Sequence, residues 1–185
     1  MQIKPKMKTY LAFLRGINVS GKNKIPMAEL RDLCNGLKLE DVRTYIQSGN
    51  VVFKSELQNT SELEALISKA IFKSFGFEVP VIVKTASQLR DILNDNPFES
   101  EDEIIRKQVY FVLLNDVPKV EEFTTFKAES YENEEFSISE NCIYLKCKTG
   151  YGKAKLNNNL LERKLKILAT TRNYRTMHKL LELSY

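Results

Sequence analysis

Apolar and polar positions along the first half of the chain follow two periods, one of about two residues and one of about three and a half. Apolar runs predict strands, and wider apolar spacing predicts amphipathic helices, one opened by Pro26 and one ended by Gly76. The predicted order is strand, helix, strand, strand, helix and strand, at residues 9–15, 26–37, 42–47, 51–54, 61–75 and 79–85.

The same order is predicted to repeat after a short helix at residues 87–93. Residues 139–144 align with residues 48–53, so each half carries a hairpin at the same place. The second set of elements is predicted at residues 109–114, 118–123, 136–139, 142–147, 155–164, 166–170 and 173–183. The chain is therefore predicted to be α+β, with duplicated ferredoxin-like βαββαβ units, two antiparallel sheets with helices, plus a C-terminal helix.

Four segments follow from this pattern. Residues 1–7 are predicted to be a flexible tail, and residues 8–94 the first ferredoxin-like half. Residues 95–106 hold an Asn-Pro pair and an acid run, which indicate a solvated acidic linker. Residues 107–185 form the second half with the C-terminal helix.

Composition narrows the class of protein. Apolar residues make up 43% and charged residues 28% of the 185 positions, and no apolar run approaches the ~20 residues of a membrane span. The three cysteines lack CxxC spacing, which favours a reduced, cytoplasmic setting. Cys34 lies on an apolar helix face, and Cys142 and Cys147 point to opposite faces of one strand, so no metal site is expected. We expect a monomer or weak homodimer with no membrane partner.

The net charge of +4 is the sum of two basic end segments and an acidic middle segment. Residues 1–54 carry ten Lys or Arg and four Asp or Glu, and residues 148–185 carry nine and two. The intervening residues 55–147 carry nine and eighteen. Two basic ends around an acidic middle favour a phosphate-bearing or polyanionic partner, although drift of charge on solvated surfaces is the alternative.

Topology brings the basic segments into two clusters. In a split βαββαβ sheet, the loop after strand one lies at the same end as the hairpin between strands two and three, and the loop after strand three lies beside the end of strand four. Both clusters combine glycines, amides and cations beside a helix N-terminus, which favours an anion. The candidate anion ligands are Arg15, Gly16, Asn18, Lys22, Lys24, Gln47, Ser48, Asn50, Lys153, Lys155, Arg172, Asn173 and Arg175.

Each candidate also has a plain structural interpretation. Residues 48–50 form a good turn without any ligand, and Asn173 suits the N-cap of the last helix. Tyr151 and Tyr174 either stack on a base or pack within the protein. His178 is interpreted as packing at the edge of the core, since no acid or base partner is visible. The Walker pattern GxxxxGK[ST] and the patterns GxSxG, HExxH and GxGxxG do not occur, so no catalytic residue and no cofactor is assigned.

The segments RGINVSGKNKIPMAEL, VRTYIQSGNVVF and TTRNYRTMHKL resemble the signature segments of a bacterial family catalogued as domain of unknown function 1697. The resemblance extends from about Lys8 to Leu183 and implies an α+β protein with two ferredoxin-like halves. It implies no established activity, cofactor or partner. Two departures from the family pattern are Tyr174, where the family often has tryptophan, and Ala154, where it commonly has serine.

Three function classes fit these observations. The first is the binding of a small phosphate-bearing, nucleotide-like ligand in a basic cleft between the halves, with or without catalysis. The second is a nucleic-acid-binding module, which strand one disfavours because residues 10–14 are apolar on both faces. The third is a protein-interaction module whose basic surface meets an acidic partner. We expect the first.

Overall fold

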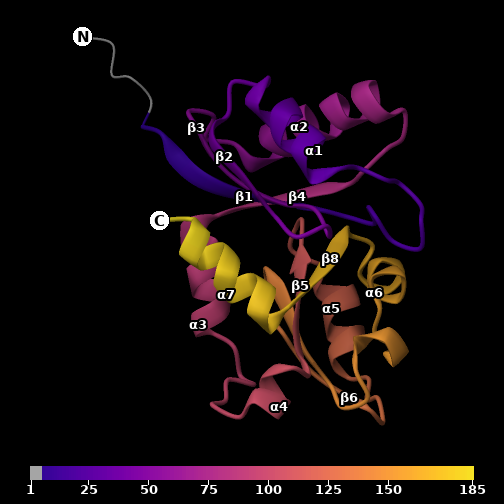
Figure 1. Cartoon of the computed structure of the whole chain (residues 1–185). Helices are drawn as coiled ribbons and strands as arrows, with labels where there is room; N and C mark the ends of the chain where they lie inside the picture. The colour runs from indigo at the N-terminus through magenta and orange to yellow at the C-terminus, as the bar shows by residue number, and fades with distance from the viewer. Residues whose placement is uncertain (1–5) are drawn as a thin grey trace. The chain divides into compact units, whose positions relative to one another are not determined.

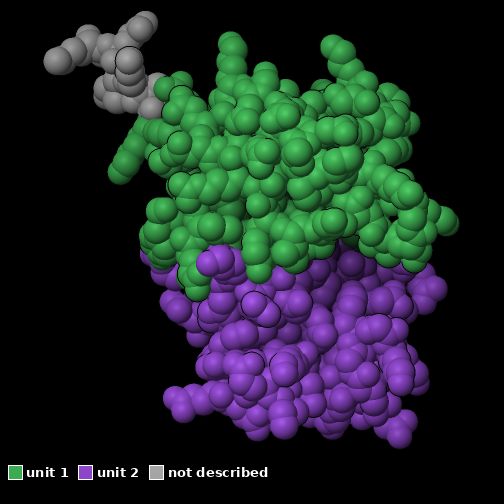
Figure 2. Space-filling model, viewed as in Figure 1, with its two compact units in different colours: residues 1–89, 180–185 green, residues 90–179 purple. Residues whose placement is uncertain are grey.

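The computed structural model describes residues 6–185, so most of the flexible tail predicted at residues 1–7 lies outside the described residues. Two compact units are distinguished in Figure 2: unit 1 comprises residues up to Leu89 together with Leu180–Tyr185, and unit 2 comprises Arg90–Lys179. Unit 1 contains β1 (Lys8–Leu14), α1 (Met27–Asn35), β2 (Glu40–Tyr45), β3 (Asn50–Ser55), α2 (Thr60–Phe75), β4 (Val81–Thr85) and the start of α3 (Ala86–Asn94).

Unit 2 repeats this order, and its elements can be followed in Figure 1. They are α4 (Glu103–Arg106), β5 (Val109–Leu114), α5 (Val120–Lys127), β6 (Glu134–Ile138), β7 (Cys142–Cys147), a 3-10 turn (Tyr151–Lys153), α6 (Asn158–Leu165), β8 (Ala169–Asn173) and most of α7 (Tyr174–Leu183).

The two sheets have the same topology. The strand order is β2-β3-β1-β4 in unit 1 and β6-β7-β5-β8 in unit 2, and every neighbouring pair is antiparallel. The predicted class, a duplicated α+β unit with a C-terminal helix, is confirmed.

In unit 1, helices α1 and α2 cover one face of the sheet (Figure 1). Alternate residues of β1, namely Tyr10, Ala12 and Leu14, pack there with apolar residues of both helices, as the period of two requires. Leu11 and Phe13, which point to the other face, are also buried, with exposed fractions of 1% and 0%. Both faces of β1 are therefore buried, as the apolar run predicted.

In unit 2, the core forms in the same way against α5 and α6. Val112 and Leu114 of β5 pack with Phe126 of α5 and Leu161 of α6. The registers of the two sheets match in detail: Lys84 lies opposite Leu11 in unit 1, and the cation Arg172 lies opposite Phe111 in unit 2. Each sheet thus buries one basic residue of its fourth strand, with exposed fractions of 5% for Lys84 and 6% for Arg172.

Some boundaries differ from the predicted ones. The helix predicted at 155–164 begins at Asn158, because the side chain of Asn157 caps it by accepting the N–H of Leu160. The strand predicted at 166–170 is β8 and runs to Asn173. The segment predicted as an acidic linker, residues 95–106, belongs to unit 2 and contains α4.

No helix within residues 6–185 is long and apolar enough to cross a membrane.

Candidate functional site

The β1–α1 loop of unit 1 (residues 15–26) is organised by one amide side chain. Asn18 Nδ2 donates to the carbonyl oxygens of Ile25 and Gln47, both at 2.9 Å, and its Oδ1 accepts the N–H of Ile25 at 2.9 Å. The bond to Gln47 joins this loop to the β2–β3 turn (residues 46–49), as the topology predicted. Asn18 is thus used to hold the loop closed.

The same loop and turn hold an unusual density of left-handed backbone. The residues with positive φ there are Gly16, Asn18, Ser20, Gly21, Asn23, Ile46 and Gly49. Ile46 is β-branched and has φ of 48°, a conformation that costs energy and is rare for such residues. Strained backbone of this kind concentrates at functional sites, so the loop and turn qualify as a candidate site.

The predicted anion ligands of unit 1 differ in their exposure to solvent. The side chains of Lys22, Lys24, Gln47 and Ser48 belong to exposed residues, whereas Arg15 and Gly16 are half-buried. Asn50 is fully buried, and its Nδ2 donates to Tyr45 O at 2.9 Å and to Ser48 Oγ at 3.0 Å. Its amide therefore holds the turn, and the predicted ligands of unit 1 that are exposed to solvent are Lys22, Lys24, Gln47 and Ser48.

In unit 2, the loop after β7 meets the end of β8, again as the topology predicted. The hydroxyl of Tyr151 donates to Thr171 Oγ1 at 3.0 Å, and the hydroxyl of Thr171 donates to Asn158 Oδ1 at 2.6 Å. The ring of Tyr151 also stacks on Tyr110 at a centroid distance of 5.0 Å. These contacts match the packing interpretation of Tyr151. Lys153 and Lys155 on this loop are exposed.

The predicted ligands around the end of β8 differ in accessibility. Arg172 is buried, and its Nη1 donates to Thr170 Oγ1 and to Thr171 O, both at 2.9 Å. Burial lowers the pKa of Arg172 to about 10. Asn173 Oδ1 accepts the N–H of Thr176 at 2.8 Å, which is the capping role considered above. Arg175 is exposed at the start of α7.

Tyr174 joins α7 to the segment predicted as a linker. Its hydroxyl donates to Glu99 Oε1 at 2.6 Å, and its ring lies 4.2 Å from the ring of His178 and 5.4 Å from the guanidinium of Arg106. Burial raises the pKa of Tyr174 to about 12, and the hydrogen bond to Glu99 adds to the rise. Tyr174 therefore anchors residues 95–106 within unit 2.

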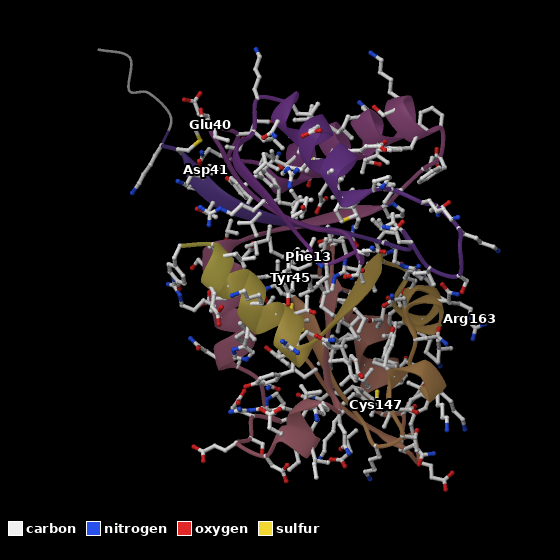
Figure 3. All side chains as sticks on the ribbon, viewed as in Figure 1. Phe13, Glu40, Asp41, Tyr45, Cys147 and Arg163 are labelled. Atoms are coloured by element: carbon white, nitrogen blue, oxygen red, sulfur yellow. The ribbon has the colours of Figure 1, made fainter. Side chains whose placement is uncertain are left out.

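A groove of about 580 Å³ follows α6 in unit 2. We call it the cationic groove, and its lining residues are Tyr131, Lys155, Asn157, Asn159, Leu160, Arg163 and Lys164. Three of these residues are cationic, and none of the described residues that line it carries a carboxylate. Arg163 lies exposed on α6, where Figure 3 labels it. The groove also includes Asn157, the N-cap of α6, where the helix dipole favours negative charge.

Lys164 and Lys155 of this groove differ in how they bond to carboxylates of the protein. Lys164 Nζ donates to Glu129 Oε1 at 2.6 Å, so part of its charge is already balanced. Lys155 engages a carboxylate through its backbone, because its N–H donates to Glu134 Oε1 at 3.2 Å. This bond does not use the side chain of Lys155, which is an exposed residue.

Sequence reasoning predicted Lys155 but missed Tyr131, Arg163 and Lys164. A signal for the basic pair was present: residues 160, 163 and 164 recur at helical spacing, which places them along one side of the predicted helix. No local signal predicted Tyr131, because it lies in the loop before β6 and reaches the groove only through tertiary packing.

Comparisons with known proteins agree with this fold. The profile of the family described as "Protein of unknown function (DUF1697)" matches residues 7–144. The solved structure described as conserved bacterial protein SP0830 from Streptococcus pneumoniae is similar, with a TM-score of 0.74 and 26% identity, over 97% of this chain and 100% of that chain. A search of curated proteins found no match.

Proposed function

The chain belongs to the family described as "Protein of unknown function (DUF1697)", and from the site itself we propose that it binds a small phosphate-bearing ligand, nucleotide-like in size, in the cationic groove of unit 2. The observation that carries this proposal is the lining of the groove, in which Lys155, Arg163 and Lys164 face a common space without a carboxylate among its described lining residues.

The chemistry of these groups suits phosphate. A guanidinium such as that of Arg163 donates two parallel hydrogen bonds to a phosphate, and a lysine ammonium such as that of Lys155 adds a compact charge. The N-terminal turn of α6 contributes backbone dipoles pointing toward the N-cap Asn157. A phosphate monoester bound here would interact with the guanidinium, the ammonium and the N-terminal turn of α6.

We extend the proposal to the β1–α1 loop of unit 1 as a second place for phosphate contact. Exposed Lys22 and Lys24, together with the glycines and left-handed residues of this loop, support it. Removal of these lysines is expected to weaken phosphate binding at this loop.

The test is binding measured by calorimetry with inorganic phosphate, sugar phosphates, nucleoside monophosphates and triphosphates, and short single-stranded RNA, each at low and at physiological salt. We expect one small phosphate compound to bind at physiological salt. Lys155→Ala and Arg163→Ala should each weaken that binding about tenfold or more, since each removes a charge-assisted hydrogen bond.

The matched control is Lys166→Ala. Lys166 is exposed on the same segment, pairs with Glu122 at 2.8 Å and does not line the groove, so its loss should leave binding unchanged. Binding by RNA alone, lost as salt rises, would replace the proposal with the nucleic-acid function. No binding by any phosphate compound would overturn it and direct attention to an acidic protein partner.

A further inference from the structure

A second pocket in unit 2, of about 490 Å³, lies along the edge strand β6. It shares Tyr131 with the cationic groove, so the two spaces are neighbours. Its lining has the opposite charge, because it includes the carboxylates of Glu129, Glu134 and Glu135 and a single cation, Lys127. We call it the Glu134 pocket.

Two of these three carboxylates have cationic partners within the protein. Glu129 accepts a hydrogen bond from Lys164 at 2.6 Å, and this bond lowers the pKa of Glu129. Glu135 pairs with Lys148 at 3.3 Å. Both pairs are partly exposed to solvent, and the third carboxylate, that of Glu134, belongs to neither of them.

Glu134 is 5% exposed and lines the pocket. Its Oε1 accepts the N–H of Lys155 at 3.2 Å, whereas its Oε2 is buried and has no hydrogen-bond partner within residues 6–185. Glu134 also acts on the nearby thiol of Cys147: burial raises the pKa of Cys147 to about 12, and the Coulomb interaction with Glu134 adds to that rise. A buried carboxylate oxygen without a donor is costly, so a donor supplied by a ligand would be strongly favoured.

We infer that Glu134 receives a protonated amino group, and that the ligand of unit 2 is a phosphate ester that also carries a primary ammonium. The inference rests on the proposed function, which supplies the phosphate end of the ligand in the cationic groove. The ammonium donates to Glu134 Oε2, and the residues Tyr131 and Phe136 line the same pocket.

The two ends of such a ligand are coupled through one residue. Lys155 donates its backbone N–H to Glu134 and is one of the residues that line the cationic groove. A ligand with its ammonium at Glu134 and its phosphate in the groove therefore contacts two residues that are bonded to each other. An ester without the amino group gains the phosphate contacts alone.

The test uses two matched pairs of phosphate esters that differ only by an amino group in place of a hydroxyl: 2-aminoethyl phosphate against 2-hydroxyethyl phosphate, and glucosamine 6-phosphate against glucose 6-phosphate. Affinities for these esters and for inorganic phosphate are measured by calorimetry at pH 7 for the wild-type chain, Glu134→Gln and Glu132→Gln. Glutamine at 134 keeps an acceptor for the Lys155 N–H and removes the charge. Glu132→Gln is the control, because Glu132 is an exposed glutamate two residues before Glu134 and lines neither pocket.

We expect at least one amino ester to bind about tenfold or more tightly than its hydroxyl partner. That preference should disappear in Glu134→Gln and persist in Glu132→Gln, while thermal unfolding shows both variants folded. Hydroxyl esters or inorganic phosphate that bind as tightly as the amino esters would overturn the inference and leave the proposed function standing. A preference that survives in Glu134→Gln would overturn it equally. No binding by any of these compounds, inorganic phosphate included, would overturn the proposed function itself.

Discussion

Gly49 of the β2–β3 turn allows a test of how tightly the turn is packed against the β1–α1 loop. A Cβ atom at this position would lie 2.7 Å from Ile17 Cδ1 and 2.8 Å from Leu14 Cβ, and the residue has φ of +80°. Gly21, in the same loop, has φ of +76°, but a Cβ there would meet no atom within 4 Å. The two glycines therefore share backbone strain and differ in packing.

The expected magnitudes follow from this difference. A side chain in the left-handed region costs about 1–2 kcal/mol, and this is the whole expected loss of unfolding free energy for Gly21→Ala. Overpacking adds about 1–3 kcal/mol, so Gly49→Ala should lose about 2–5 kcal/mol in all. The excess over Gly21→Ala corresponds to roughly 2–12 °C in Tm for a chain of this size.

The assay is urea unfolding at 25 °C followed by far-UV circular dichroism, with thermal unfolding as a second measure. Equal losses in the two variants would refute the reasoning, because they would mean that only backbone strain matters and that Ile17 does not restrain the turn. A loss confined to Gly21→Ala would refute it more strongly.

Two further predictions concern single interactions. Asn18→Ala should lower the unfolding free energy by about 1–3 kcal/mol in the same urea assay, since it leaves both backbone groups of buried Ile25 without the side-chain partner. Asn18→Asp should lose at least as much, because its carboxylate keeps the acceptor for the Ile25 N–H but replaces the donor to the carbonyl oxygens of Ile25 and Gln47 by a second acceptor. The hydrogen bond from Lys164, followed by that from Tyr131, lowers the pKa of Glu129. The Glu129 carboxylate therefore stabilises the fold at pH values above the ordinary glutamate pKa of 4.5, and this stabilisation is lost as the pH falls through the lower pKa of the folded state. Lys164→Met should therefore flatten the dependence of unfolding free energy on pH below about pH 5, and an unchanged slope would show that the pair contributes nothing.

The fold could be predicted from the sequence because burial imposes periods that survive in the residues themselves. The apolar run of β1 and the spacing of α1 and α2 each point to one structure. The prediction failed where the usual end signal is absent. Lys166 follows α6 in a left-handed conformation, a position that glycine normally occupies, so the connection after the helix was missed and β8 was predicted to begin at residue 166 instead of Ala169.

The candidate site was predicted less completely, because it depends on contacts that local patterns do not encode. Topology alone brought residues 15–26 beside the β2–β3 turn, and the bond from Asn18 to Gln47 bears this out. Glu134 was missed because the strand was predicted to begin at Phe136. Two more residues of alternation would have placed Glu134 on the same face as Phe136 and Ile138, which pack against the core, and would have revealed a carboxylate at an inward position.

Comparison of the two units separates what the fold requires from what it does not. Lys84 and Arg172 occupy the same register position in their sheets and are both buried, so a basic residue there belongs to the shared plan. Two features of the described residues have no counterpart. Residues 15–26 connect β1 to α1, whereas the shorter segment of residues 115–119 connects β5 to α5.

The second feature is the buried carboxylate. In unit 2, Glu134 at the start of β6 lies opposite Cys147, and the next residue, Glu135, lies opposite Lys146. Glu40 opposite Lys54 takes the position of Glu135 in unit 1, and the residue before Glu40 is the buried Leu39. Figure 3 labels Glu40 and Cys147. A fold that forms without a buried carboxylate in one unit does not need it in the other, and burial of such a group is costly. The cost of Glu134 is best accounted for by a ligand that supplies the missing donor, which is why its amide variant discriminates between a structural carboxylate and a binding one.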